Sequence, residues 1–173
     1  AMDSPRSQVA KTAADTLGLL CQKVGSTFDA VVAASQVVSL DNFAEPIMTK
    51  LIAKGSGASS KFMFDSALAT IRDAVGAMPS VKVAAAILSQ PCPKSEKGKV
   101  LYGEAITATL AEAPTGIFAG KETLVRLARA IDALTSDPMA EPRETGKKAA
   151  AALGQYCRDS TERLKPLLER EVG

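Results

Sequence analysis

Apolar residues recur at steps of three and four along this chain, and turns containing Gly or Pro separate the segments that carry them. Between Lys121 and Leu134, for example, Leu124, Leu127 and Ile131 share one helical face. This is the period of an α-helix with one buried side, and no run alternates as a half-buried strand would. The pattern therefore predicts an all-α chain.

Helix-start and helix-stop signals divide the chain into eight or nine short helices. Phe28–Leu40 is rich in Ala and Val without alternation, so a helix is favoured there and a strand is the alternative. Pro46 must lie in the first turn of its helix or kink it. The other expected helices are Pro5–Val24, Asp41 to Gly55-Ser56-Gly57, Ser59 or Ser60 to Met78-Pro79, Ser80–Ser89, Ser95 to Pro114-Thr115-Gly116, Lys121–Leu134, Pro142–Cys157 and Ser160–Glu171.

The spacing of these helices indicates a repeat architecture. Helix, short turn, helix, longer turn recurs about every 35 to 55 residues, which brackets the HEAT and armadillo repeats. A four-helix bundle would instead need about four long helices of similar length. We expect an α-solenoid of about four stacked HEAT-like hairpins as one domain over residues 4–173, with Ser80–Ser89 paired to the helix before it. Ala1-Met2 resembles a cloning remnant, so residues 1–3 are expected to be that or a disordered start, and the natural protein to extend further.

Composition narrows the partners. Hydrophobic residues are 46% of the 173, but aromatics are 4% and Trp is absent, so the core must consist of Ala, Leu, Val and Ile. The 21 basic and 19 acidic residues are too balanced for an electrostatic nucleic-acid binder, and Tyr102 and Tyr156 are too few to stack bases. No apolar run approaches the roughly 20 residues that span a bilayer, and no signal peptide is evident. We expect a soluble, cytoplasmic protein with neither nucleic-acid nor membrane partners.

The sequence has few of the residues and motifs that catalysis commonly uses. His is absent, which removes the commonest general base and metal ligand. Gly55–Ser60 lacks the Gly-Lys-Ser/Thr end of a phosphate loop, and Ser60-Lys61 has no accompanying oxyanion motif. Glu104, Glu112 and Asp132 are expected on solvated helix faces. We expect no enzyme, no catalytic residue and no cofactor.

The cysteines do not form a pattern typical of a metal site or of a disulfide framework. Cys21, Cys92 and Cys157 are odd in number and far apart, without the spacing of a zinc site or of a disulfide framework. Cys21 and Cys157 are expected to be small buried hydrophobes. The sequence therefore predicts no metal site and favours a reducing compartment.

Basic residues gather where turns lead into helices, most fully in Ser136–Lys148. Because they lie at or near the start of the first helix of each expected pair, stacking would bring several onto one edge. The alternative is that they are ordinary solvated charges, and cations at a helix start are disfavoured by about 0.3 to 1 kcal/mol each. The residues concerned are Arg6, Lys61, Lys97, Lys99, Arg143, Lys147 and Lys148.

Several short motifs at these junctions resemble one family. Glu141–Lys148 is similar to an acidic-x-Arg-x-x-Gly-basic-Lys helix start, and Leu167–Val172 to a closing Leu-Glu-basic-x-Val. Arg6–Lys11 resembles the Arg-Ser-x-Val-basic start of an earlier repeat, and Ser60-Lys61-Phe62 the next loop. These are features of the TOG domain, a HEAT-repeat module that binds αβ-tubulin, and most of all of the crescerin group of ciliary microtubule regulators.

The resemblance implies that turns within repeats form a ridge that contacts the acidic tubulin surface. Leu101 departs from it, since the family's Asn-x-x-Val-Arg signature has Arg there. The Trp-bearing first repeat is also missing, and about four repeats replace six. The contacts that the resemblance assigns are Arg6, Ser60, Lys61, Lys97, Lys99 and Arg143.

The expected function is a non-catalytic module that binds tubulin or microtubules within a larger cytoskeletal protein. The isolated domain is expected to be monomeric. Its expected place is the cytoplasm and cytoskeleton, with the cilium, flagellum or basal body suggested by the resemblance alone. The alternative is a HEAT or armadillo-type scaffold that binds a different protein, for example by taking a helix into a groove, or that self-associates.

Overall fold

A computed structural model describes residues 8–9, 11–13, 15–20, 41–78, 80–114, 116–118 and 121–172. Within these ranges the regular structure is helical throughout, so the all-α prediction is confirmed. Residues 8–9, 11–13 and 15–20, called here the N-terminal helical residues, are helical as expected for the first helix. The expected start of that helix at Pro5 and the whole segment Phe28–Leu40 lie outside the described residues.

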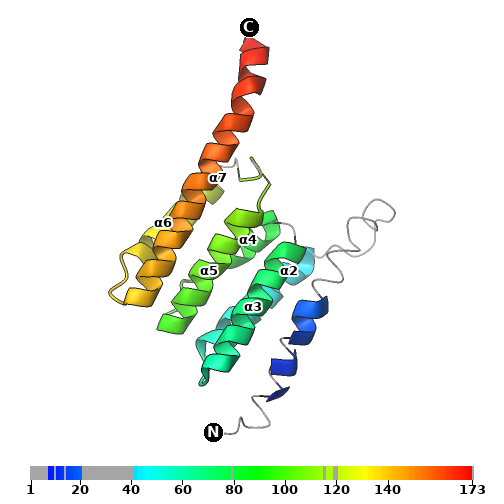
Figure 1. The fold of residues 1–173 in the computed structure, drawn as a ribbon, viewed down its shortest axis with the longest axis vertical. Coiled ribbons are helices and arrows are strands. Elements are labelled where there is room, and N and C mark those ends of the chain that lie inside the picture. The colour runs from blue at the N-terminus through cyan, green and yellow to red at the C-terminus, as the bar shows by residue number, and fades with distance from the viewer. Residues whose placement is uncertain are drawn as a thin grey trace.

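After the N-terminal helical residues, the described part of the chain forms six helices (Figure 1). Ser60 precedes the second of them and accepts a hydrogen bond through Oγ from the amide of Met63 at 3.3 Å. Ser95 does the same for Gly98 at 3.2 Å, so both serines are N-caps. The helix start expected at Ser95 is confirmed, and of the two expected alternatives, Ser59 and Ser60, the structure has Ser60. The helices are α2 (Asp41–Ser56), α3 (Lys61–Ala77), α4 (Ser80–Leu88), α5 (Glu96–Glu112), α6 (Lys121–Thr135) and α7 (Ala140–Val172).

The expected boundaries agree closely with α2 to α6, but the prediction for the last two helices is wrong. One helix, α7, runs unbroken from Ala140 to Val172. Ser160, taken as a helix start, lies inside it and donates its hydroxyl to the carbonyl of Tyr156 at 2.8 Å. Such a bond to the preceding turn lets Ser sit within a helix. Pro46 lies inside α2 beyond its first turn, which excludes the first of the two alternatives expected for it.

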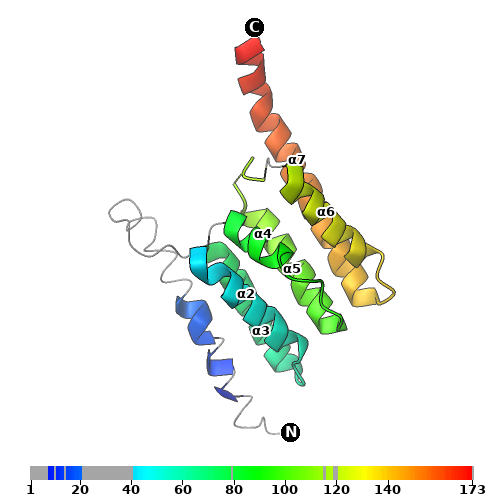
Figure 2. The same cartoon turned by 180° about the vertical axis from the view of Figure 1, so that it is seen from behind.

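The helices form two layers. The layer of α2, α4 and α6 packs in that order, and the layer of α3, α5 and α7 lies over it. Figures 1 and 2 show the two layers from opposite sides. The N-terminal helical residues extend the second layer beside α3, since Ser66 on α3 donates a hydrogen bond to Asp15 at 3.0 Å. Lys11 also lies 4.4 Å from the ring centre of Phe62.

Helix pairing differs from the sequence prediction. The hairpins are α2 with α3, α4 with α5, and α6 with α7, whereas α3 is not packed along α4. Two residues, Met78 and Pro79, separate α3 from α4, and α4 begins the next hairpin. The basic junctions therefore precede the second helix of each hairpin, and not the first.

Helix α5 is at the centre of the core. It packs against α2, α3, α4 and α7, and Leu101 and Ile106 have no exposed surface. Buried Ala, Leu, Ile and Val side chains dominate the core, as the composition predicted. Both tyrosines are also buried, which removes them from any surface platform. Cys157, expected to be buried, is exposed on α7, and Cys21 lies outside the described residues.

Close approach of α7 to α6 depends on one glycine. A Cβ at Gly146 would lie 2.6 Å from the backbone nitrogen of Thr135 and 2.8 Å from the carbonyl carbon of Leu134. Real Cβ atoms do not come so near to backbone, so only Gly permits this packing distance. The glycine of the Glu141–Lys148 motif is therefore required by the packing of the hairpin.

Candidate functional site

The turns within the three hairpins lie along one edge of the stack, which we call the turn edge. It comprises the α2–α3 turn (57–60), the α4–α5 turn (89–95) and the α6–α7 turn (136–139), together with the helix starts that follow them. The start of α5 lies between the other two turns and contacts both. The sequence prediction that the junctions share an edge thus agrees with the contacts of these three turns.

Lys97 joins the α5 start to the first of these turns. Its ammonium donates a hydrogen bond to the carbonyl of Ala58 at 2.5 Å, and the side chain is half-buried. A carbonyl in a tight turn lacks a helical partner, and Lys97 supplies one. The cation is therefore engaged within the molecule.

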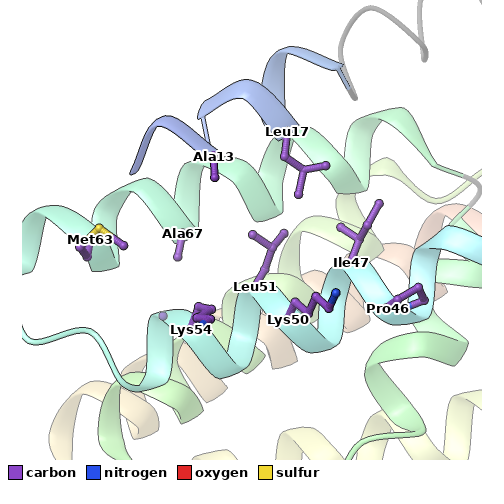
Figure 3. A pocket seen from close by; sticks show the side chains of 10 residues that line it. Ala13, Leu17, Pro46, Ile47, Lys50, Leu51, Lys54, Met63 and Ala67 are labelled. Atoms are coloured by element: carbon purple, nitrogen blue, oxygen red, sulfur yellow. The ribbon is translucent and has the colours of Figure 1, made fainter. Parts of the chain in front are cut away.

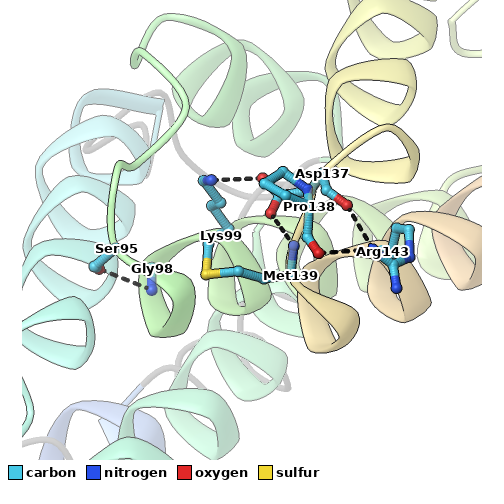
Figure 4. Close-up of polar contacts among 7 residues, drawn as sticks. All are labelled: Ser95, Gly98, Lys99, Asp137, Pro138, Met139 and Arg143. Carbon is cyan, nitrogen blue, oxygen red and sulfur yellow. Dashed lines mark hydrogen bonds and ion pairs between the residues drawn. The ribbon is translucent and has the colours of Figure 1, made fainter.

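Lys99 joins the same helix start to the last turn. Its ammonium lies 2.5 Å from Oδ2 of Asp137, with 18% and 7% of the two side chains exposed (Figure 4). The other carboxylate oxygen of Asp137 accepts a hydrogen bond from the amide of Met139 at 3.0 Å. The hydrogen bond from Lys99, and then that from Met139, hold the pKa of Asp137 below its ordinary value. A charged, hydrogen-bonded pair thus links two hairpins.

Arg143 closes the α6–α7 turn. Its Nη1 donates to the carbonyl of Asp137 at 3.0 Å and to that of Pro138 at 2.8 Å (Figure 4). A single guanidinium nitrogen therefore serves two adjacent carbonyls that the turn leaves without helical partners. The best-matched residue of the family motif has a structural role that the sequence alone did not indicate.

The predicted contacts thus divide by environment. Lys61, at the first position of α3, is exposed and makes no ion pair among the described residues. Ser60 uses its hydroxyl as a helix cap, while Lys97, Lys99 and Arg143 are bound to neighbouring turns as described above. Arg6 lies outside the described residues. Only Lys61 of this set presents a cation to solvent at the described turn edge.

Leu101 is the residue that departs from the family signature. Leu101, which stands where the family signature has Arg, is fully buried in the core.

Cys92 is exposed in the α4–α5 turn, and partial desolvation raises the pKa of its thiol more than Lys99 lowers it. A raised pKa leaves the thiol protonated near neutral pH, which is the less nucleophilic form.

Sequence reasoning missed two carboxylates that organise the structure. Asp137 was not singled out in the sequence, because its partner Lys99 is 38 positions earlier in the chain. Glu104 was expected on a solvated face, yet only 13% of its side chain is exposed. It lies 2.8 Å from Arg72 on α3 and 3.8 Å from Lys148 on α7, so it bridges the second layer across α5.

The described residues contain no group of three or more metal-ligating side chains, and none of the described helices is long and apolar enough to cross a membrane. Neither a family model nor a curated protein matches the chain.

Proposed function

We propose that this chain is a HEAT-like α-solenoid, related to TOG domains, that binds tubulin or microtubules through its turn edge without catalysis. The observation that supports this most directly is the alignment of three hairpin turns along one edge, where Lys97 contacts Ala58 and Lys99 contacts Asp137. Repeat proteins bind through such continuous surfaces, because successive repeats present equivalent turns side by side.

Internal contacts give this edge the rigidity that a binding surface needs. A loop that must be ordered on binding costs conformational free energy, and a turn already held by its neighbours avoids that cost. We therefore assign Lys97, Lys99 and Arg143 to shaping the edge and Lys61 to direct contact. An exposed lysine at the start of α3 can meet an acidic partner surface and raise the association rate. Arg6 remains a proposed contact from the resemblance.

Microtubule co-sedimentation and gel filtration with free tubulin test the proposal. Lys61→Ala should weaken binding by about fivefold, as expected for an exposed cation at an interface, without changing the melting temperature. The matched control is Arg129→Ala, since Arg129 is exposed on α6 away from the turns.

Lys99→Met and Arg143→Ala should lower both affinity and melting temperature, because they loosen the turns. No binding by wild-type protein in either assay would refute a tubulin function. The turn edge is not the binding surface if tubulin binding is unchanged in all three variants, Lys61→Ala, Lys99→Met and Arg143→Ala.

A further inference from the structure

A groove lies between α2, α3 and the N-terminal helical residues, outside the contacts described so far (Figure 3). Its volume is about 440 Å³. In Figure 3, Leu17 extends from the N-terminal helical residues toward Leu51 and Ile47 on α2, while Met63 and Ala67 of α3 lie toward one end. The lining residues are Ala13, Leu17, Pro46, Ile47, Lys50, Leu51, Lys54, Gly55, Met63 and Ala67.

The chemistry of the groove is apolar with two cations. Lys50 and Lys54 are the charged residues among those that line it, and both are exposed. Neither makes an ion pair or hydrogen bond among the described residues. Apolar surface beside two exposed ammonium groups favours an amphipathic occupant that carries negative charge.

The spacing along α2 specifies the shape of that occupant. The residues of α2 that line the groove begin at Pro46 and end at Gly55, a rise of about 14 Å at 1.5 Å per residue. This length matches about two and a half turns of a partner helix. Lys50 and Lys54 are one turn apart, about 6 Å along the axis, so carboxylates at i and i+4 of a helix lying along α2 would face both.

We propose that this groove binds an amphipathic helix of a partner protein. Aliphatic side chains of that helix enter between α2 and the N-terminal helical residues. Two acidic residues of the helix, four positions apart, contact Lys50 and Lys54. Helix-in-groove binding uses apolar anchors at i, i+3, i+4 and i+7, which a groove of this length can accept. Lys50 and Lys54 lie on α2 outside the turn edge, so substituting them tests the groove separately from the turn edge.

The test uses the whole chain and a labelled Ala-based helical peptide with Leu at i, i+3, i+4 and i+7 and Glu at i+1 and i+5. Fluorescence anisotropy should show saturable binding. Replacing both Glu by Gln in the peptide should weaken binding by about tenfold, and Lys50→Gln with Lys54→Gln in the protein should do the same. Because the same ion pairs are lost, combining the two changes should add little.

Three controls separate this groove from other surfaces. Lys94→Gln removes an exposed lysine elsewhere and should leave peptide affinity unchanged. Lys61→Ala should also leave peptide affinity unchanged, although it should weaken tubulin binding. Loss of peptide binding and loss of tubulin binding can therefore be distinguished. Ala13→Phe fills the groove from an exposed position and should weaken binding about tenfold without unfolding the protein, as circular dichroism would verify.

Some outcomes would overturn the proposal. Absence of saturable binding up to about 1 mM peptide would do so, as would equal affinity for the Glu and Gln peptides. Binding that survives Ala13→Phe and the double lysine change would place the peptide elsewhere. Equal binding of the peptide and of lauric acid vesicles, with loss of both in the lysine variants, would indicate an anionic amphiphile site and not a helix site.

Discussion

The ammonium of Lys99 on α5 lies 2.5 Å from the carboxylate of Asp137 in the α6–α7 turn, and this pair connects two successive hairpins. The residues are 38 positions apart, and both side chains are largely shielded from water. Lys97, two residues earlier, reaches in the opposite direction to Ala58 in the α2–α3 turn. Two lysines of one helix start therefore hold the turns on either side of it.

Asp137→Asn should reduce the free energy of unfolding near neutral pH and change its dependence on acid. The pKa of Asp137 lies below its ordinary 3.8, chiefly because of the hydrogen bond from Lys99. A carboxyl whose pKa is lower in the folded state stabilises the fold fully above its unfolded pKa, and loses this contribution as pH falls through the folded value. The wild-type protein should therefore lose stability from about pH 4 downward.

Urea unfolding of both proteins from neutral to acid pH measures this effect. The difference between Asp137→Asn and wild type should shrink as the pH falls, since protonation removes the same charge. Asp132→Asn, at an exposed position on α6, is the control and should follow wild type. A difference between Asp137→Asn and wild type that stays constant with pH would show that the ionic form of this carboxylate contributes nothing to stability.

Glu104→Gln should destabilise the protein by about 1 kcal/mol, because it removes the charge that Arg72 and Lys148 share. The loss is limited since the two cations are more than half exposed and water can solvate them. Chemical denaturation measures it. The control is Glu144→Gln on α7, where the ion pair with Lys147 at 3.6 Å is exposed on both sides. Equal effects of the two substitutions would contradict a bridging role for Glu104.

Gly146→Ala should destabilise the protein by about 1 to 3 kcal/mol, although Ala is the better helix former. The new Cβ would meet the backbone of Thr135 and Leu134, which cannot move aside as a side chain end could. Gly154→Ala in the same helix is the matched control, since its Cβ would meet only Arg158 Nη1 at 3.7 Å. That substitution should stabilise by about 0.5 to 1 kcal/mol. Thermal melts of both variants decide the matter, and similar shifts would refute the close packing of α6 and α7.

Tyr102→Phe should make the protein less sensitive to alkali. Burial raises the pKa of Tyr102 to about 12 from its ordinary 10.0, and a smaller contribution comes from Cys92. A group whose pKa is raised in the folded state contributes stability below its unfolded pKa, and that contribution is lost as pH rises through the folded value. The wild-type protein should therefore lose stability between about pH 10 and 12.

Denaturant unfolding in alkaline buffers, with tyrosinate absorbance read in parallel, provides the measurement. In Tyr102→Phe the loss of stability between about pH 10 and 12 should be smaller. The absorbance of this variant should also lack the phenol that titrates at high pH. If the absorbance difference between wild type and Tyr102→Phe titrates near the ordinary pKa of 10.0 in the folded protein, the burial of Tyr102 is contradicted.

The sequence by itself determined the local structure. Apolar residues at three- and four-residue steps, serine caps at Ser60 and Ser95, and Pro or Gly in the turns specify where helices α2 to α6 begin and end, because these signals act within one or two helical turns. It also determined a core of small aliphatic side chains and the position of the basic residues near helix starts. It misplaced the break near Ser160, since a serine can cap a helix or bond to the preceding turn within one.

Only the tertiary structure decided which helices pair and which charges remain free. Hairpin pairing depends on how apolar faces meet in three dimensions, so α3 packs with α2 although two residues separate it from α4. The partners of Lys97, Lys99 and Glu104 are more than 30 positions away in sequence, and no local pattern encodes a contact at that distance. Folding therefore turned most of the predicted binding cations into internal links and left Lys61 exposed.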